Sequence, residues 1–297
     1  MNAEARIYRI GVVALLLLAS VSVATGQQID RDQIVAQLNK DGCVQLDQRK
    51  LKFCRVDYVA GGWRVDAIAI YPLTEGRYPG LLLLPGFEGT SKTLLGIGAL
   101  FAQQGFACLA VTPPGFGDSG GKRDFMGPAS IDAFAVGFRN FARQSYVDPT
   151  RMAVFGYSRG GMAASLLTVK LGKEVHAAVF ASGVYDFRRA FQQTRLDGIR
   201  ENMKAETGMT EIAIAERSSI LYMDKLKCPV LITHGAIDGN APVNQAYLLR
   251  DRLVELKKDH EFKILPDHVH GQLKMDFLSL VLDFLSRKLK GAPATFK

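Results

Sequence analysis

The residues Gly156-Tyr-Ser-Arg-Gly160 have the spacing of a nucleophile elbow, a sharp strand-to-helix turn that presents a catalytic serine. An apolar run, Met152 to Phe155, precedes them, and small, helix-compatible residues follow. Glycine at both ends lets the strand and helix backbones approach closely, so that Ser158 Oγ stands clear. Ser158 would lie at a helix N-terminus, where free N–H groups stabilise an oxyanion. A glycine-rich turn with an incidental serine has the same pattern, but the surrounding sequence favours a nucleophile.

A serine nucleophile needs a histidine to take its proton and a carboxylate to orient that histidine. In the chain order Ser, acid, His, two histidines in the loop after the last expected strand are candidates, His268 and His270. Asp238 follows the C-terminal end of a strand and would share the strand-end plane of Ser158, and Asp186, after the preceding strand, is the alternative acid. Either aspartate would otherwise be a turn or helix-cap residue. The remaining histidines are expected to be structural or on the surface: His176, His234 and His260.

Residues 1–26 have the order of a secretory signal peptide. Two arginines precede an apolar run that starts at Ile10, and small residues follow it. Cleavage after Ala24 and cleavage after Gly26 both fit this pattern. An uncleaved membrane anchor is the alternative, because the apolar run is only a little shorter than a membrane span. We expect the mature chain to be exported, to the periplasm or the extracellular space, and to have no membrane span.

The remaining residues are enough for one large domain with a substantial core. The formal net charge of the chain, +8, changes little without residues 1–26, which carry two arginines and one glutamate. The basic residues are spread along the chain and are not interleaved with aromatic residues, so a nucleic-acid partner is not expected.

Four cysteines are present. Cys43 and Cys54 flank a short polar segment, and in an oxidising compartment they would either form a disulfide or remain free. Cys108 and Cys228 lie in apolar, strand-like stretches and are expected to be buried as small hydrophobic residues. No spacing of cysteine and histidine suggests zinc, and we expect neither a metal nor a cofactor.

An alternation of apolar strands and helices predicts a mainly parallel sheet with helices on both faces. Residues 27–50 form a lead-in with a short helix at Ile34 to Leu38, and the main domain extends over 51–291. The first two strands, joined at Gly61-Gly62, are expected to form a hairpin. The expected strands are 51–58, 63–71, 81–84, 107–111, 152–155, 177–180, 229–234 and 262–265, and the expected helices are 92–104, 131–144, 159–171, 243–257 and 273–289.

Between about residues 185 and 224 this alternation breaks. The segment is polar and helical in pattern, with no expected strand. An insertion at this point would lie over the carboxyl ends of the strands, where such sheets bind ligands. We predict a small helical cap.

Together these features resemble the α/β-hydrolase superfamily, and within it the serine hydrolases similar to prolyl oligopeptidase and dienelactone hydrolase. The resemblance covers roughly Leu51 to Leu289, and it implies an α/β-hydrolase fold. Members of that group place the catalytic histidine directly before a glycine, which selects His270 over His268. The resemblance rests on Gly115 to Gly120, Gly156 to Gly161, Cys228 to Asp238, Pro242 to Ala246 and His270-Gly271.

The resemblance also implies a second oxyanion donor in the loop Pro85 to Gly89. Many relatives have His-Gly at the start of this loop, whereas this chain has Pro-Gly. By position, the backbone N–H groups of Phe87 and Arg159 would form the oxyanion hole. Glu88 is unusual there, and it would either contact a cationic group on a substrate or be a solvated loop carboxylate.

We therefore expect an exported serine hydrolase that cleaves an ester or amide (peptide) bond through an acyl-enzyme, with Ser158, Asp238 and His270 as its triad. A non-catalytic binding protein on the same scaffold is the alternative, since a fold alone does not give function. Peptidases in the prolyl oligopeptidase group usually carry a large N-terminal propeller, and only about 50 residues precede the core here. That difference favours a small ester or a short peptide as substrate.

Overall fold

The computed structural model describes residues 30–296, so the predicted signal peptide lies outside the described residues. The strands are β1 (Cys43–Leu46), β2 (Leu51–Arg55), β3 (Tyr58–Ala60), β4 (Trp63–Val65), β5 (Ala67–Pro72), β6 (Tyr78–Leu84), β7 (Ala107–Val111), β8 (Val147–Tyr157), β9 (Ala177–Ala181), β10 (Val230–Gly235) and β11 (His260–Leu265). The α-helices are α1 (Arg31–Asp41), α2 (Leu95–Gln103), α3 (Pro128–Ala142), α4 (Arg159–Leu171), α5 (Phe187–Gln193), α6 (Asp197–Thr207), α7 (Glu211–Arg217), α8 (Asn244–Glu255) and α9 (Met275–Lys290). Short 3-10 helices are η1 (Asp47–Arg49), η2 (Ser91–Leu94), η3 (Gly172–Glu174) and η4 (Ser219–Lys225).

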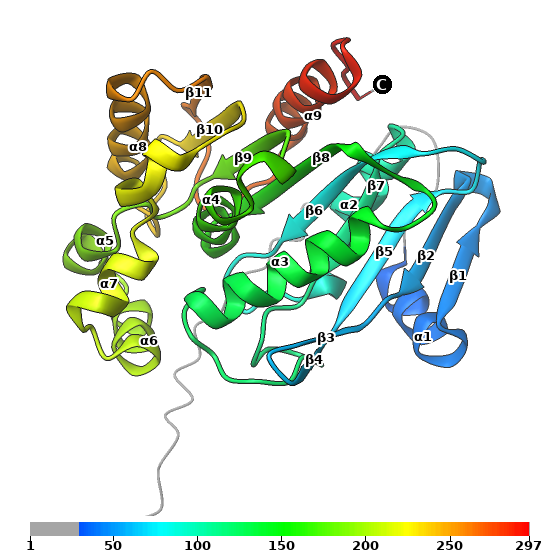
Figure 1. The fold of residues 1–297 in the computed structure, drawn as a ribbon, viewed down its shortest axis with the longest axis horizontal. Coiled ribbons are helices and arrows are strands. Elements are labelled where there is room, and N and C mark those ends of the chain that lie inside the picture. The colour runs from blue at the N-terminus through cyan, green and yellow to red at the C-terminus, as the bar shows by residue number, and fades with distance from the viewer. Residues whose placement is uncertain (1–29, 297) are drawn as a thin grey trace, which may run out of the picture.

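Within the described residues, a nine-stranded sheet in the order β1-β2-β5-β7-β6-β8-β9-β10-β11 forms the centre of the molecule (Figure 1). Neighbouring strands from β7 to β11 in this order are parallel. At the other edge, β1, β2 and β5 continue the sheet in antiparallel pairs. The mainly parallel sheet expected from the sequence is therefore confirmed.

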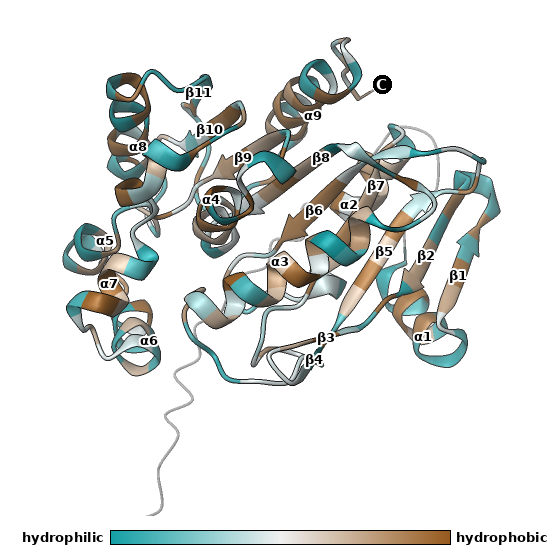
Figure 2. Ribbon diagram, in the orientation of Figure 1, coloured by the Kyte–Doolittle hydropathy of each residue, from teal (hydrophilic) through white to brown (hydrophobic). Residues whose placement is uncertain are grey.

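Helices cover both faces of this sheet and create two hydrophobic layers. Residues of α3, α4 and α8 pack in one layer, and residues of α1, α2 and α9 pack in the other. The run Leu81 to Leu84 in β6 shows why the strand is wholly apolar. Leu82 and Leu84 belong to the first layer, whereas Leu81 and Leu83 belong to the second, because successive side chains of a strand point to opposite faces. Figure 2 accordingly shows β6 and β9 largely in the colours of hydrophobic residues.

The N-terminal strands form the expected hairpin around Gly61-Gly62, but its ladder is interrupted. β2 pairs with β5 in the main sheet, and beyond the interruption β3 pairs with β4 in the same register as a separate two-stranded sheet. The break falls where the buried Asp66 carboxylate accepts hydrogen bonds from the hydroxyls of Ser91 and Thr112, both at 2.6 Å. The Asp66 N–H donates to the Ser119 hydroxyl at 2.9 Å, so at this residue a side chain replaces the partner strand. The edge strand β1 is also not expected from the sequence, because it is only four residues long and partly polar.

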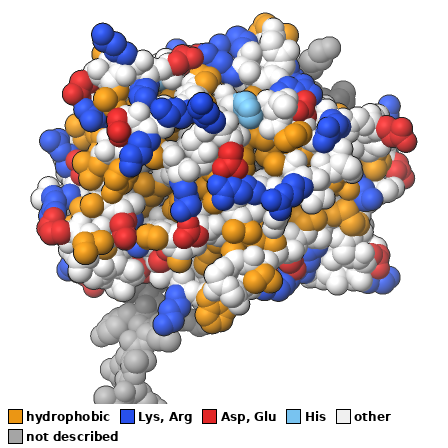
Figure 3. Space-filling model, in the orientation of Figure 1, with side chains coloured by type: hydrophobic (Ala, Val, Ile, Leu, Met, Phe, Trp, Pro, Cys, Tyr) orange, Lys and Arg blue, Asp and Glu red, His pale blue; other side chains and the backbone are white. Residues whose placement is uncertain are grey.

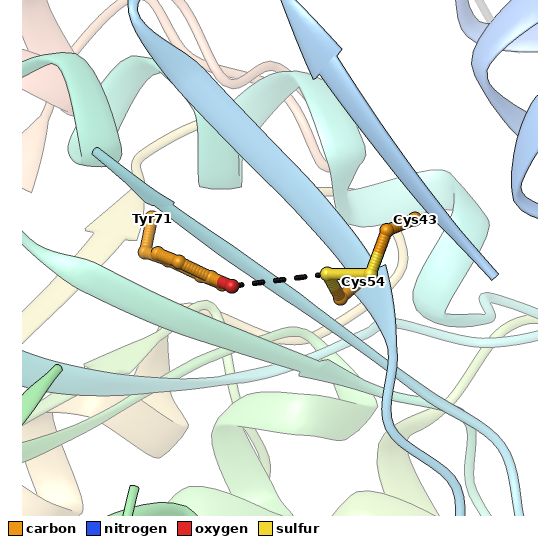
Figure 4. The surroundings of a disulfide bond; sticks show 3 residues. All are labelled: Cys43, Cys54 and Tyr71. Atoms are coloured by element: carbon orange, nitrogen blue, oxygen red, sulfur yellow. Dashed lines mark hydrogen bonds between the residues drawn. A yellow bond between two sulfur atoms is a disulfide. The ribbon is translucent and has the colours of Figure 1, made fainter. Parts of the chain in front are cut away.

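A disulfide joins Cys43 of β1 to Cys54 of β2, which decides between the two alternatives left open by the sequence (Figure 4). The two cysteines are directly opposite each other in the antiparallel register. On the neighbouring strand β5, the Tyr71 hydroxyl donates to Cys54 Sγ across 3.8 Å. Cys108 and Cys228 are buried free thiols, as expected.

The segment between β9 and β10, where the sequence predicts a cap, holds α5, α6, α7 and η4. Figure 1 shows α5, α6 and α7 grouped together at one end of the molecule. Several contacts tie them to the loop after β7, among them two hydrogen bonds. Arg217 Nε of α7 donates to the backbone oxygen of Asp124 (3.1 Å), and the Phe125 N–H donates to Glu206 Oε2 of α6 (2.7 Å).

On the face of the molecule drawn in Figure 3, basic side chains are mixed with acidic and hydrophobic ones. Among residues 30–296, no helix is both long enough and apolar enough to cross a membrane.

Candidate active site

The elbow forms where β8 ends at Tyr157 and α4 begins at Arg159. Ser158, between them, has a φ of 57°, a left-handed conformation that non-glycine residues rarely adopt. A Cβ on Gly156 would lie 1.9 Å from the backbone oxygen of Gly160, and a Cβ on Gly160 would lie 2.2 Å from that of Leu84. The two glycines are therefore required by the close approach of strand and helix, as the sequence pattern predicts.

The structure brings the three predicted triad residues together from three separate loops. Ser158 Oγ lies 2.8 Å from His270 Nε2, and His270 Nδ1 lies 2.7 Å from Asp238 Oδ2. Asp238 comes from the loop between β10 and α8, and His270 from the loop between β11 and α9. Both distances are those of good hydrogen bonds, so that a proton on Ser158 has a direct path to a base that is itself oriented.

The side chain of Asp238 is fully buried, and both of its carboxylate oxygens accept hydrogen bonds. Oδ1 accepts from the backbone N–H groups of Asn240 and Ala241, each at 2.9 Å. Oδ2 is shared by His270 and by His234, whose Nε2 lies 3.2 Å away. Burial alone would raise the pKa of Asp238, but the hydrogen bonds from His234 and His270 outweigh it and hold this pKa well below its ordinary value. Asp238 is thus a carboxylate at neutral pH, as an imidazole-orienting group must be.

His268 and Asp186, the alternative histidine and acid of the triad, have other partners. His268 Nε2 lies 2.8 Å from Asp276 Oδ2, which belongs to the first turn of α9. Asp186 is the N-cap of α5, where its side chain accepts from the Arg189 N–H at 3.0 Å. Asp186 is therefore the helix-cap residue that the sequence offered as its alternative role.

The backbone conformation after His270 favours a glycine at position 271. Gly271 has a φ of 88°, in the left-handed region that favours glycine, and a Cβ there would lie 3.7 Å from the Tyr157 hydroxyl. The Tyr157 ring packs beside the His270 imidazole, with 5.4 Å between the ring centroids. The tight turn at Gly271 and the Tyr157 ring together hold the imidazole next to Ser158.

The loop expected to supply oxyanion donors lies beside the nucleophile. A Cβ on Gly86 would lie 3.4 Å from Ser158 Cβ, which places this loop next to the elbow. Arg159 is the first residue of α4, so its N–H has no partner within the helix. Glu88, in the same loop, is exposed to solvent, as one of the two sequence alternatives has it, and it pairs with Arg123 at 2.9 Å.

Two residues near the site were not singled out from the sequence. The sequence predicts a structural role for His234, but its position four residues before Asp238 is a local signal for the contact between them. Glu206 of α6 pairs with the Arg159 side chain (2.8 Å) across 47 residues of chain, and no local pattern indicates such a contact. Among the residues that the structure describes, no group of three or more potential ligands could hold a metal ion.

The fold and this geometry define the chain as a hydrolase of the α/β-hydrolase class. Residues 97–292, well over half of the chain, match the sequence model of the prolyl oligopeptidase family. The chain therefore belongs to the prolyl oligopeptidase family, and this membership makes it an enzyme of the serine hydrolase type.

The chain is also similar to individual proteins, one in sequence and two in fold. The chain is 31% identical to "Uncharacterized peptidase YtmA" of Bacillus subtilis (strain 168) over 209 residues, which is 69% of this chain and 80% of YtmA. Its fold is similar to that of the uncomplexed acylaminoacyl peptidase of Pyrococcus horikoshii, with a TM-score of 0.71 and 17% identity over 88% of this chain; this chain spans 45% of that one. It is also similar in fold to the acetyl xylan esterase from Paenibacillus sp. R4, with a TM-score of 0.68 and 18% identity, covering 87% of this chain and 93% of the esterase.

Proposed function

We propose that this chain is an exported serine hydrolase that cleaves an ester or amide bond through an acyl-enzyme. Ser158 is the nucleophile, His270 the general base and acid, and Asp238 the group that orients His270. The observation that carries this proposal is the continuous hydrogen-bonded series from Ser158 Oγ through His270 to the buried Asp238 carboxylate.

The reaction follows from this arrangement. Ser158 Oγ attacks the carbonyl carbon while His270 Nε2 takes its proton, and the N–H groups of Phe87 and Arg159 stabilise the oxyanion that forms. His270 then donates this proton to the leaving alcohol or amine as the acyl bond breaks. A water molecule attacks the acyl-enzyme in the same way, again losing its proton to His270, which returns the proton to Ser158 as the acid product departs.

The substrates that we propose are small esters or short peptides. Glu206 of the cap segment contacts the residue directly after the nucleophile, so α6 lies close to the acyl site and limits the space around it. Relatives in the family include proteins named as peptidases, and a structural neighbour is named as an esterase, so both bond types belong in a first screen.

A fluorophosphonate probe and a p-nitrophenyl ester test the proposal together. The wild-type chain should be labelled on Ser158 and should turn over the ester, whereas Ser158→Ala should do neither. A folded wild-type protein that resists the probe and hydrolyses no ester or peptide chromogen would support the binding-protein alternative instead.

Export is supported by two independent observations. The sequence of residues 1–26 has the order of a signal peptide, and the Cys43–Cys54 disulfide suits an oxidising compartment outside the cytoplasm. N-terminal sequencing of protein recovered outside the cytoplasm should begin near Thr25 or Gln27. An intact Met1 in that fraction would contradict the proposed cleavage.

A further inference from the structure

The Arg159 side chain is a buried cation with unused hydrogen-bond donors. It is 4% exposed, and its Nη2 donates to Glu206 Oε2 at 2.8 Å. Its Nε and Nη1 atoms are buried and have no hydrogen-bond partner among residues 30–296. Because buried polar groups are nearly always hydrogen-bonded in folded proteins, donors left unpaired beside a nucleophile require an explanation.

Three phenylalanine rings surround the guanidinium. The distances from Arg159 Cζ to the ring centroids are 4.5 Å for Phe125, 4.7 Å for Phe116 and 5.4 Å for Phe87. Aromatic faces attract a cation, but they accept no in-plane hydrogen bond from the guanidinium edge. Burial lowers the pKa of Arg159, yet arginine keeps its proton under all ordinary conditions. The rings therefore accommodate the charge and leave the Nε and Nη1 donors unpaired.

The elements around Arg159 are those that border the acyl site. Its own backbone N–H is a proposed oxyanion donor, Phe87 lies in the other oxyanion loop, and Glu206 belongs to α6 of the cap segment. Phe116 and Phe125 are buried, whereas Phe87 is 41% exposed. Phe87 is therefore the only one of these three rings that is exposed to solvent.

We propose that the Arg159 side chain selects the substrate by donating hydrogen bonds to an oxygen acceptor in its acyl part. The acceptor is a carboxylate or a carbonyl oxygen a few bonds from the scissile ester or amide. An acyl group of this kind pairs the Nε or Nη1 donors, whereas a hydrocarbon acyl group leaves them unpaired. A site built for hydrogen bonds discriminates strongly against analogues that lack the acceptor. This inference rests on the proposed hydrolase function and names its substrate class.

Three p-nitrophenyl esters with matched acyl chains test the proposal: the hexanoate, the 5-oxohexanoate and the adipate monoester, each corrected for spontaneous hydrolysis. The wild-type enzyme should favour at least one of the two acceptor-bearing esters over the hexanoate by about 10- to 100-fold in kcat/KM, as expected for a hydrogen bond to a charged group. The better of the two identifies the acceptor as carbonyl or carboxylate.

Arg159→Met keeps the backbone N–H and most of the side-chain bulk but removes the donors. The ratio of kcat/KM for the better acceptor-bearing ester to kcat/KM for the hexanoate should therefore fall towards one. Arg123→Met is the matched control. Arg123 also lies over the Phe116 ring, but it is half-exposed and paired with Glu88, so its loss should leave the wild-type preference in place.

A wild-type preference near one would overturn the inference, even if Arg159→Met fails to fold, and so would a preference that survives in folded Arg159→Met. Both results leave the hydrolase function standing, since the esters are still cleaved. Absence of all turnover and of fluorophosphonate labelling in the wild type would overturn the function and this inference together.

Discussion

Ser158, His270 and Asp238 form one hydrogen-bonded series, so we expect them to act as a unit. Replacing any one should lower kcat on a p-nitrophenyl ester by about 10⁴-fold or more, and Ser158→Ala/His270→Ala should be barely worse than Ser158→Ala, because the base has nothing left to activate.

Asp186→Asn and His268→Ala are the matched controls for this prediction. Their partners are the start of α5 and Asp276, so both variants should keep most of the wild-type kcat. Circular dichroism checks that each variant folds. Loss of activity in Asp186→Asn with normal activity in Asp238→Asn would place the acid after β9 instead of after β10.

His234 provides a second prediction at the scale of single residues. Its Nε2 lies 3.2 Å from Asp238 Oδ2 and 3.0 Å from the backbone oxygen of Ala241, and since both are acceptors, Nε2 must carry the proton. His234→Phe removes this donor from the carboxylate and should lower kcat by roughly 10-fold, whereas His234→Gln keeps an N–H donor and should lose less. Equal kcat values for the two variants, with both folded, would show that the hydrogen bond contributes nothing.

At the scale of elements, the disulfide between β1 and β2 should stabilise the antiparallel edge without affecting catalysis. Three strands separate β1 and β2 from β8, which ends directly before Ser158. Cys43→Ala/Cys54→Ala should lower the free energy of unfolding by about 2 kcal/mol, near the lower end for disulfides because the closed loop is short. The kcat should remain at its wild-type value.

Urea unfolding with and without dithiothreitol measures this effect. The reductant should bring the wild-type chain to the stability of the double variant and should leave the variant unchanged. A wild-type curve that does not respond to the reductant would contradict the prediction.

Elements with a strong local pattern could be predicted from the sequence. The expected helix at 159–171 coincides with α4, because small residues follow an elbow whose glycines the packing requires. The split of the first hairpin could not be predicted, since the side chains that hold Asp66 come from Ser91 and Thr112, far along the chain. In the same way, Ser158, Asp238 and His270 follow from motifs near strand ends, whereas the pairing of Arg159 with Glu206 depends on where the cap segment folds.

At the scale of the whole molecule, stability should fall in acid. Hydrogen bonds from neighbouring groups hold the pKa of several carboxyl groups below its ordinary value, and for Asp238 and Asp276 these bonds outweigh burial, which acts in the opposite direction. The carboxyl groups are Asp118, Asp148, Glu174, Asp238, Glu261 and Asp276. Because the pKa of each group is lower in the folded state than in the unfolded state, the unfolded chain binds protons at these groups before the folded chain does as the pH falls.

The stabilisation from these groups is therefore present above about pH 4 to 5 and is lost as the pH falls through the folded-state values. For Asp148 that value is about 2. Urea unfolding at pH 7 and at pH 3 should give a lower free energy of unfolding at pH 3. A free energy that is equal or higher at pH 3 would contradict the prediction.

A single oxygen atom, Glu206 Oε2, accepts from both the Phe125 N–H and the Arg159 guanidinium. The cap segment, the loop after β7 and the nucleophile helix thus share one acceptor. The cap segment therefore cannot be exchanged independently of the loop after β7 and of α4, either in protein engineering or in evolution. A replacement cap would have to supply its own carboxylate at this point, or the receiving scaffold would need a neutral residue after its serine.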